Sequence, residues 1–286
     1  MLGSLLLIVQ QQALAGTLVV RDDTGLTITL TRPAQRIVSL APHLTEILFA
    51  VGAGAQVVGT VEYSDYPSEA KRLPRVGSYV QFDMERIVAM RPDLIVAWQS
   101  GNNQAQVAQL RKMGYRVFLN EPRRILDVAA SLERIGVLAG RGEQAARQSS
   151  MFRARHAELQ ARYSQRRPVR TFYEVWNKPL MTVSGQHLIG DVMKLCGAEN
   201  VFSGLSVLTP TIDVEAVVAA APEVIIASGM DESRPEWLDD WRRWPNMKAV
   251  RQHHLYFVPP DLLHRHTPRI LDGAEMFCEQ VDRARK

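Results

Sequence analysis

Apolar and polar positions along the chain follow two periods, one typical of buried strands and one typical of amphipathic helices. The clearest example occurs twice: residues 83–97 and residues 213–227 align without a gap at an offset of 130 positions. In each copy an Asp able to cap a helix opens a short helical stretch, a Pro helps to end it, and a β-branched apolar run typical of a buried strand follows. This duplication predicts an α/β protein with two similar lobes.

The first lobe alternates the two patterns. Strands are predicted at 17–20, 26–30, 36–40, 56–59, 94–97 and 116–119, and helices at 44–51, 84–90, 107–113 and 125–138. Alternating strands and helices predict a mostly parallel sheet covered by helices on both faces. In the second lobe the same signals predict strands at 169–175, 224–227 and 255–258 and helices at 187–196, 214–220, 237–244 and 268–285.

A single long helix is predicted between the lobes. Residues 143–165 contain neither Gly nor Pro, which permits a helix of about 35 Å. Its apolar positions are too sparse for a coiled-coil seam, so we expect a rigid brace along both lobes. The predicted division is a signal peptide at 1–15, an N-terminal lobe at 16–141, the connecting helix at 142–166 and a C-terminal lobe at 167–286.

The N-terminus has the features of an export signal. Leu5–Val9 is a short apolar core, and Ala13-Leu14-Ala15 is the small-x-small pattern that signal peptidase accepts. No Lys or Arg precedes the core, which leaves the start of translation open, and a frayed buried strand is the alternative reading. No other stretch approaches the roughly 20 apolar residues that span a bilayer. An exported protein located in the periplasm is therefore expected.

Composition excludes several function classes. The 286 residues are 46% hydrophobic and 22% charged, which indicates globular domains. The net charge of +4 is dispersed, so nucleic-acid binding is not expected. No nucleophile-elbow motif, dinucleotide-binding glycine pattern or zinc-ligand spacing occurs among the glycines, serines and seven histidines, which argues against an enzyme and against a bound metal or other cofactor.

The two cysteines, Cys196 and Cys278, are predicted to form a disulfide in the second lobe. Their even number suits an exported chain, because the compartment outside the cytoplasm permits oxidation. Two buried free thiols are the alternative.

Several motifs together resemble one family. They are Tyr63-Ser64-Asp65-Tyr66-Pro67, Glu85-Arg86-Ile87-Val88-Ala89, Pro92-Asp93-Leu94-Ile95-Val96-Ala97-Trp98, Cys196-Gly197-Ala198-Glu199-Asn200 and Pro268-Arg269-Ile270. With the two lobes and the rigid helix they resemble the periplasmic substrate-binding proteins of ABC importers for cobalamin, haem and siderophores, above all the cobalamin-binding members. The resemblance implies a monomer that captures cobalamin or a related corrinoid and delivers it to membrane permease subunits. A haem or ferric-siderophore carrier is the alternative within the family, and an exported hydrolase or metal carrier is the alternative outside it.

The resemblance also implies a ligand site. The residues that match the family's site are Tyr63, Tyr79, Trp98, Asp261, Leu262, Leu263, His264 and Arg265. An aromatic ring can lie against the apolar face of a corrin while Asp and Arg side chains bond its rim amides. Alternatively, Tyr63 is a packed surface aromatic and Asp261–Arg265 a structural ion pair. Tyr79 and Thr209 stand where cobalamin-binding members have Trp, which leaves the corrinoid open, and ligation of cobalt or iron by His264 also stays open.

Glu85 and Glu215 occupy matching positions in the two copies of the repeat. The fold needs Asp83 and Asp213 as helix caps, but it needs no second acidic residue. In the family the matching glutamates dock on arginines of the permease, one per lobe. The alternative is that both are first-turn glutamates favoured by the helix dipole.

Overall fold

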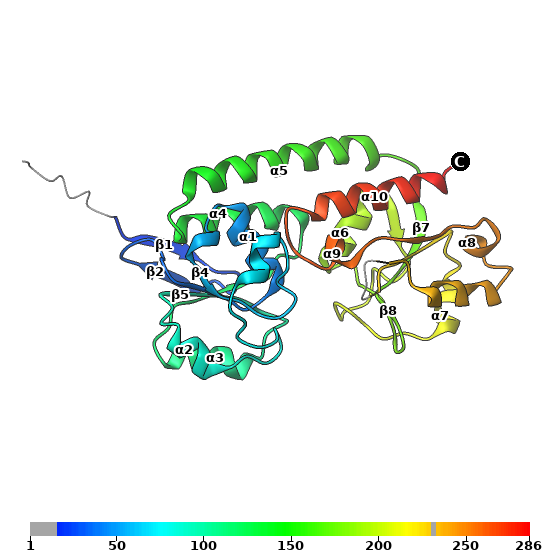
Figure 1. The fold of residues 1–286 in the computed structure, drawn as a ribbon. Helices are drawn as coiled ribbons and strands as arrows, with labels where there is room; N and C mark the ends of the chain where they lie inside the picture. Colours follow the sequence, from blue (N-terminus) through cyan, green and yellow to red (C-terminus); the bar gives the residue numbers. More distant parts are fainter. Residues whose placement is uncertain (1–15, 230–232) are drawn as a thin grey trace, which may run out of the picture.

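The computed structural model describes residues 16–229 and 233–286, and it has two α/β lobes joined by one long helix, α5 (Gly142–Tyr163). Figure 1 shows the lobes side by side with α5 running along one side of both. The predicted fold class is therefore confirmed. The predicted signal peptide lies outside the described residues.

The two sheets have the same topology. In the N-terminal lobe β3 (Ile37–Ser39), β4 (Val57–Gly59), β5 (Leu94–Trp98) and β6 (Val117–Asn120) are all parallel in the order β4-β3-β5-β6. In the C-terminal lobe β7 (Val169–Glu174), β10 (Ala198–Asn200), β11 (Val224–Ala227) and β12 (Leu255–Phe257) are parallel in the order β10-β7-β11-β12. In each lobe the second strand along the chain lies at one edge, beside the first. The duplication seen in the sequence thus extends to the whole sheet.

Helices cover both faces of the N-terminal sheet. Neighbouring residues of a strand point to opposite faces, so they pack under different helices. Ile37, Leu94 and Val96 pack under α1 (Pro42–Ala50) and α4 (Ile125–Leu138), whereas the residues next to them, Val38 and Ile95, pack under α2 (Met84–Ala89) and α3 (Gln104–Lys112). The remaining elements of this lobe are the antiparallel hairpin β1 (Leu18–Arg21) and β2 (Thr27–Leu30), η1 (Gly54–Gln56) and η2 (Ser68–Arg72).

The C-terminal sheet is covered in the same way. One face packs under α6 (Leu188–Leu195) and α10 (Ile270–Arg283), and the other under α7 (Val214–Ala220) and η3 (Glu236–Arg243). The Trp-rich helix predicted at 237–244 is present, but it is a 3₁₀ helix rather than an α-helix. The remaining elements are the hairpin β8 (Trp176–Asn177) and β9 (Leu180–Met181), α8 (Lys248–Arg251) and α9 (Pro260–Leu263).

The repeated segments have matching hydrogen bonds. The side chains of Asp83 and Asp213 accept from the backbone N–H of Arg86 at 3.0 Å and of Ala216 at 2.7 Å, which confirms both as helix caps. Each helix is followed by a left-handed residue before Pro, Arg91 with φ 45° and Ala221 with φ 48°.

Two arginines close these helices at their other ends. Arg36 donates to the last turn of α2 at Met90 O, 2.9 Å away, and Arg170 donates to the last residue of α7 at Ala220 O, 2.6 Å away. A guanidinium at a helix C-terminus satisfies carbonyls that have no partner within the helix and lies at the negative end of its dipole. Both copies are therefore fixed to the neighbouring strand in the same way.

Helix α5 packs on both lobes, as predicted for a brace. Its first half lies against α4, where Gly136 allows the close approach of Ala145: a Cβ on Gly136 would lie only 2.2 Å from the Ala145 methyl. Leu159 and Tyr163 belong to the apolar core of the C-terminal lobe. At 22 residues the helix is about 33 Å long and ends two residues before the predicted Gln165.

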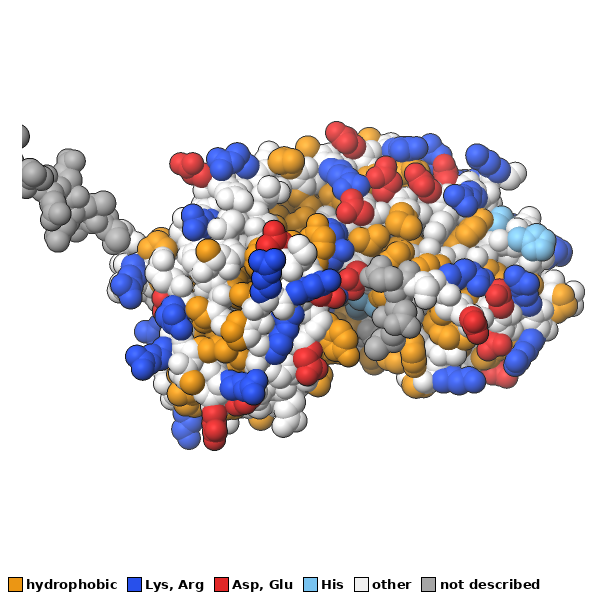
Figure 2. Space-filling model, in the orientation of Figure 1, with side chains coloured by type: hydrophobic (Ala, Val, Ile, Leu, Met, Phe, Trp, Pro, Cys, Tyr) orange, Lys and Arg blue, Asp and Glu red, His pale blue; other side chains and the backbone are white. Residues whose placement is uncertain are grey.

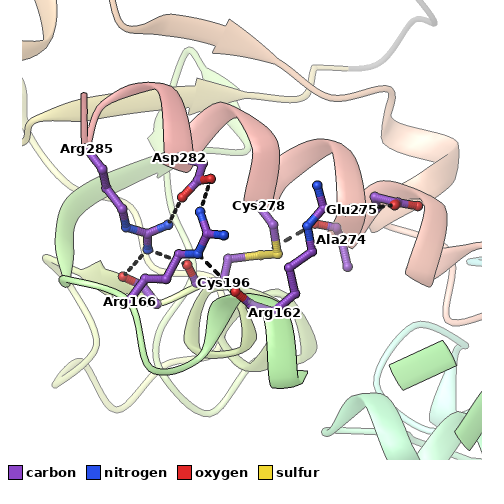
Figure 3. Close-up of a disulfide and its surroundings, with 9 residues drawn as sticks. Arg162, Arg166, Cys196, Ala274, Glu275, Cys278, Asp282 and Arg285 are labelled. Carbon is purple, nitrogen blue, oxygen red and sulfur yellow. Dashed lines mark hydrogen bonds and ion pairs between the residues drawn. A yellow bond between two sulfur atoms is a disulfide. The ribbon is translucent and has the colours of Figure 1, made fainter. Parts of the chain in front are cut away.

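A disulfide between Cys196 and Cys278 joins the end of α6 to α10, which confirms the predicted pairing. Figure 3 shows arginines around it. Arg285 donates to Cys196 O at 2.7 Å and to Gly197 O at 3.2 Å, and it pairs with Asp282 at 2.6 Å. The C-terminus of α6 is thus held to α10 by a covalent bond and by a charged cap.

Reduction of this disulfide is expected to lower the melting temperature. The bond closes a loop of 82 residues, and removing such a constraint typically costs about 2–4 kcal/mol. Cys196→Ser should reproduce most of the loss. Thermal unfolding with and without reductant measures it, and a wild type that is indifferent to reductant and has two titratable thiols would reject the bond.

Candidate ligand-binding cleft

A cavity of about 300 Å³ lies where the two lobes meet. Its walls include Trp98, Glu121 and Arg123 from the N-terminal lobe and His187, Thr209 and His266 from the C-terminal lobe. The three N-terminal residues stand at or just after the carboxyl ends of β5 and β6, where parallel α/β sheets bind ligands. Figure 2 shows a notch between the lobes on the side away from α5.

Trp98, one of the predicted ligand residues, is the last residue of β5 and lines the cavity. Its ring centroid is 6.0 Å from that of Tyr79, so these two predicted ligand residues lie side by side. It also lies edge-on to His43 at 5.2 Å and to His266 at 5.7 Å. The Trp98 Nε1–H is buried and has no hydrogen-bond acceptor in the described part of the chain.

Asn102, which the sequence did not single out, holds this corner of the cleft together. Its side-chain oxygen accepts from Trp98 N at 2.6 Å, and its Nδ2 donates to Leu40 O at 2.8 Å and to Tyr79 O at 2.6 Å. One buried amide thereby ties the ends of β3 and β5 to the loop of Tyr79. No pattern in the sequence reveals this role, because Asn is also common in turns.

Tyr63 lies on a strained loop with its side chain accessible. The residue is 70% exposed and its backbone is left-handed, with φ 62°. A network of buried hydroxyls holds the loop: Ser64 lies 2.8 Å from Thr60, which lies 2.7 Å from Thr45. Non-glycine residues in this conformation cost free energy and often mark functional sites. Tyr63 does not line the 300 Å³ cavity, so its ligand contact stays a prediction.

Ion pairs join the two lobes beside the cavity. Arg265 of the C-terminal lobe reaches Glu46 on α1 at 3.0 Å and Asp65 at 2.7 Å, and Arg269 reaches Glu46 at 2.6 Å through Nη2 and at 2.9 Å through Nε. Although burial opposes it, the hydrogen bond and charge of Arg265 lower the pKa of Asp65. We call Glu46, Asp65, Asp261, Arg265 and Arg269 the inter-lobe network.

The predicted loop 261–265 is divided between this network and the core. Asp261 and Arg265 pair with each other at 2.8 Å. In this structure they therefore form the structural ion pair that the sequence left open as an alternative to ligand binding. Leu263 is fully buried and Leu262 packs against the same core, so here they are packing residues. His264 lies 3.0 Å from the hydroxyl of Tyr173, within the C-terminal lobe.

Four histidines gather at the lobe interface, and the sequence connected only two of them, His264 and His266. His43 lies on α1, His187 caps α6, and His264 and His266 precede α10. The His266 ring is 5.2 Å from His43 and 6.4 Å from His187. Burial lowers the pKa of His43 to about 3, helped by Arg265, and that of His264 to about 4, helped by His187. We call these four residues the histidine cluster.

Acid is expected to destabilise the protein because of this cluster. Burial, with the charge of Arg123, also lowers the pKa of His187 to about 4, and burial holds that of His266 well below 6.5. At these four positions the unfolded chain therefore binds more protons than the folded chain below about pH 6.5. Stability is full above that pH and falls as the pH drops toward 4.

Melting temperature measured between pH 7 and pH 5 tests this expectation. His43→Asn should reduce the slope, since it removes one titrating group from the histidine cluster. A melting temperature that stays constant over this range would contradict the neutral, buried state of these rings.

The sequence profile of the family described as periplasmic binding protein matches residues 37–262. This chain belongs to the periplasmic binding protein family. The predicted family and the predicted periplasmic location are confirmed.

Relatives of this periplasmic binding protein include proteins named vitamin B12-binding proteins. The vitamin B12-binding protein of Vibrio cholerae serotype O1 is 34% identical over 255 residues, covering 89% of this chain and 91% of the relative. That of Yersinia pestis is 36% identical over 259 residues, covering 88% and 89%.

Solved structures of similar proteins have the same two-lobed fold. Periplasmic vitamin B12 binding protein BtuF of Vibrio cholerae superimposes with a TM-score of 0.82 at 34% identity, covering 89% of this chain and 99% of that structure. The periplasmic haem-binding protein RhuT from Roseiflexus sp. RS-1 has a TM-score of 0.74 at 21% identity, covering 88% and 100%, and shares the fold.

Glu85 and Glu215 hold matching places on the surface of this periplasmic binding protein. Both are exposed in the first turn of their helices, α2 and α7. Figure 1 shows α2 and α7 on the side of the two lobes opposite α5. Three residues on, Val88 and Val218 are each 36% exposed. Each lobe therefore presents one carboxylate beside one apolar side chain. Across residues 16–229 and 233–286, no helix is both long and apolar enough to cross a membrane.

Proposed function

We propose that this chain captures cobalamin, or a related corrinoid, between its two lobes and delivers it to an ABC importer. The observation that carries the proposal is the 34% identity to a vitamin B12-binding protein across 89% of the chain, together with the shared two-lobed structure. The relatives are named as binding proteins, so we propose a carrier and no catalytic residues. The cargo is a transported ligand rather than a cofactor.

The cleft suits a broad ligand with an apolar face. Trp98 and Tyr79 offer adjacent aromatic rings, and the exposed Tyr63 is available for a third contact. A corrin is larger than the 300 Å³ cavity, so it must also cover the surface beside it. Arg265 then exchanges part of the inter-lobe network for amides of the ligand, and Asp261 accepts from others.

Haem is the second candidate. Tyr79 and Thr209 stand where cobalamin-binding members have Trp, and imidazoles line the cleft instead. A less aromatic, histidine-lined cleft suits a ligand with an iron centre.

We also propose the division of the chain. Residues 1–15 are removed on export, residues 16–141 and 167–286 form the lobes, and residues 142–166 connect them. The mature protein acts as a monomer that docks on permease subunits through Glu85 and Glu215.

Calorimetric titration of the mature protein tests the proposed ligand. Cyanocobalamin should bind with one site per chain, and more tightly than haemin. Tight binding of haemin with no binding of cyanocobalamin would reject the corrinoid and favour the second candidate.

A substitution of Trp98 tests whether the ligand binds in this cavity. Trp98→Ala should weaken cyanocobalamin binding by at least about tenfold, because a buried aromatic anchor typically contributes 2 kcal/mol or more. Tyr115→Ala is the matched control: Tyr115 is a partly buried aromatic of the same lobe that precedes β6 and does not line the cavity. Equal affinity of the two variants would place the ligand elsewhere.

A further inference from the structure

His266 differs from the other members of the histidine cluster. It lines the cavity together with His187, whereas His43 and His264 are not among the lining residues. His187 Nδ1 accepts from Ile189 N at 3.1 Å, which places the proton of the neutral ring on Nε2 and leaves that atom a donor only. His264 Nε2 is engaged by the Tyr173 hydroxyl. His266 alone of the two lining imidazoles keeps a free lone pair.

The ring nitrogens of His266 have no partners in the described part of the chain. The residue is 5% exposed, and Nδ1 is buried without a hydrogen bond. Nε2 makes no hydrogen bond with the described residues, and the residue lines the cavity. A buried polar side chain without partners requires an explanation, and a ligand that enters the cavity supplies one.

The ring is also held in place and kept neutral. Trp98, His43 and His187 surround it at centroid distances of 5.7, 5.2 and 6.4 Å. Burial and the neighbouring histidines hold the pKa of His266 well below 6.5. A neutral imidazole whose orientation is fixed by packing is the form that binds a metal, and imidazole nitrogen is a good donor to iron and cobalt.

We infer that His266 is an axial ligand for the central metal of a macrocyclic cargo, a cobalt corrinoid whose axial position holds exchangeable water. The ligand exchange forms one bond between Nε2 and cobalt and releases one water, while the ring proton stays on Nδ1 and the oxidation state of cobalt does not change. Within residues 16–229 and 233–286 no three side chains form a metal-binding group, so His266 provides a single bond to a metal that arrives with the cargo.

The inference rests on the proposed function and specifies its ligand. A corrinoid with both axial positions filled, such as cyanocobalamin, gains nothing from His266. A corrinoid without the nucleotide base, such as diaquocobinamide, gains a coordinate bond. The cleft would therefore favour incomplete or base-off corrinoids over complete ones.

Absorption spectra test the coordinate bond. The mature wild-type protein is titrated with diaquocobinamide and, separately, with cyanocobalamin, and the corrin bands and the affinity are recorded. We expect diaquocobinamide to show a band shift typical of nitrogen coordination and cyanocobalamin to show none. In His266→Ala the shift should disappear and the affinity for diaquocobinamide should fall by about tenfold or more, while that for cyanocobalamin changes far less.

Two further variants make the test specific. His156→Ala replaces a histidine on α5 that does not line the cavity and should behave as wild type. In His266→Gly, added imidazole should restore the band shift, which a purely structural role would not do.

The outcomes separate the two claims. Binding of both corrinoids by the wild type without a band shift, or with a shift that survives in His266→Ala, would overturn the axial ligand and leave the proposed function standing. Failure to bind either corrinoid would overturn both. A wild-type spectrum without a band shift overturns the axial ligand even where a variant does not fold.

Discussion

Replacing Glu85 and Glu215 together by alanine is expected to abolish delivery of the ligand by the reconstituted transporter. Folding and ligand affinity should stay near those of the wild type, because both side chains are exposed and neither lines the cavity. Each single change should cause a partial loss. Ligand-stimulated ATP hydrolysis and uptake into proteoliposomes measure the effect.

The expectation follows from the duplication of the lobes. The helices α2 and α7 have the same Asp cap, the same left-handed exit before Pro and the same arginine at the carboxyl end. Both helices lie on the side of the lobes away from α5 (Figure 1), and each has one exposed glutamate in its first turn. A partner with two-fold symmetry can then form the same charge-assisted contact twice.

The alternative is that both glutamates only favour the helix dipole, which contributes a few tenths of a kcal/mol. A matched control separates the readings. Glu143→Ala with Glu158→Ala removes two exposed carboxylates from α5, on the opposite side of the molecule, and should leave transport unchanged. Wild-type delivery by the Glu85/Glu215 double variant would defeat the docking proposal.

Glu46→Ala is expected to lower the free energy of unfolding by about 3–5 kcal/mol. Glu46 is 3% exposed and accepts from Arg265 and Arg269, which come from the other lobe. Its removal leaves two partly buried guanidinium groups short of a counter-charge, and this costs more than the ion pair itself contributes. The variant should also loosen the contact between the lobes.

Chemical denaturation measures the loss, and Glu69→Ala is the matched control because Glu69 is an exposed carboxylate of the same lobe. Glu46→Gln should fall between the two, since the amide still accepts hydrogen bonds but has no charge. A second change, Arg269→Ala, should cost less in the Glu46→Ala background than in the wild type. Equal stabilities of Glu46→Ala and Glu69→Ala would mean that the inter-lobe network does not hold the lobes.

The elements with strong local signals could be predicted from the sequence. The repeat at 83–97 and 213–227 has apolar periodicity, Asp caps and Pro stops, and the structure has both helices and both strands where these signals place them. The connecting helix followed from the absence of Gly and Pro. The disulfide followed from an even number of cysteines in an exported chain.

Other elements depend on tertiary contacts. Strand β10 has the sequence Ala-Glu-Asn, which has weak β-propensity, and it forms because it pairs with β7. The Trp-rich segment winds as a 3₁₀ helix, although its residues suit an α-helix equally well.

Only part of the candidate site could be predicted, because the rest also depends on tertiary contacts. Trp98 ends a predicted strand and lines the cavity, with Tyr79 beside it. Arg265 and Glu46 are 219 positions apart in the chain, and His43 and His266 are even farther apart. No local pattern connects such pairs, so neither the inter-lobe network nor the histidine cluster was expected.

A crystal structure of the mature protein grown with cyanocobalamin tests the central claim most directly. The account predicts one corrin between the lobes, with its face against Trp98 and Tyr79, its rim amides near Asp261 and Arg265, and the inter-lobe network partly opened. A corrin bound outside the cleft, or a cleft that stays closed and empty at saturating ligand, would contradict it.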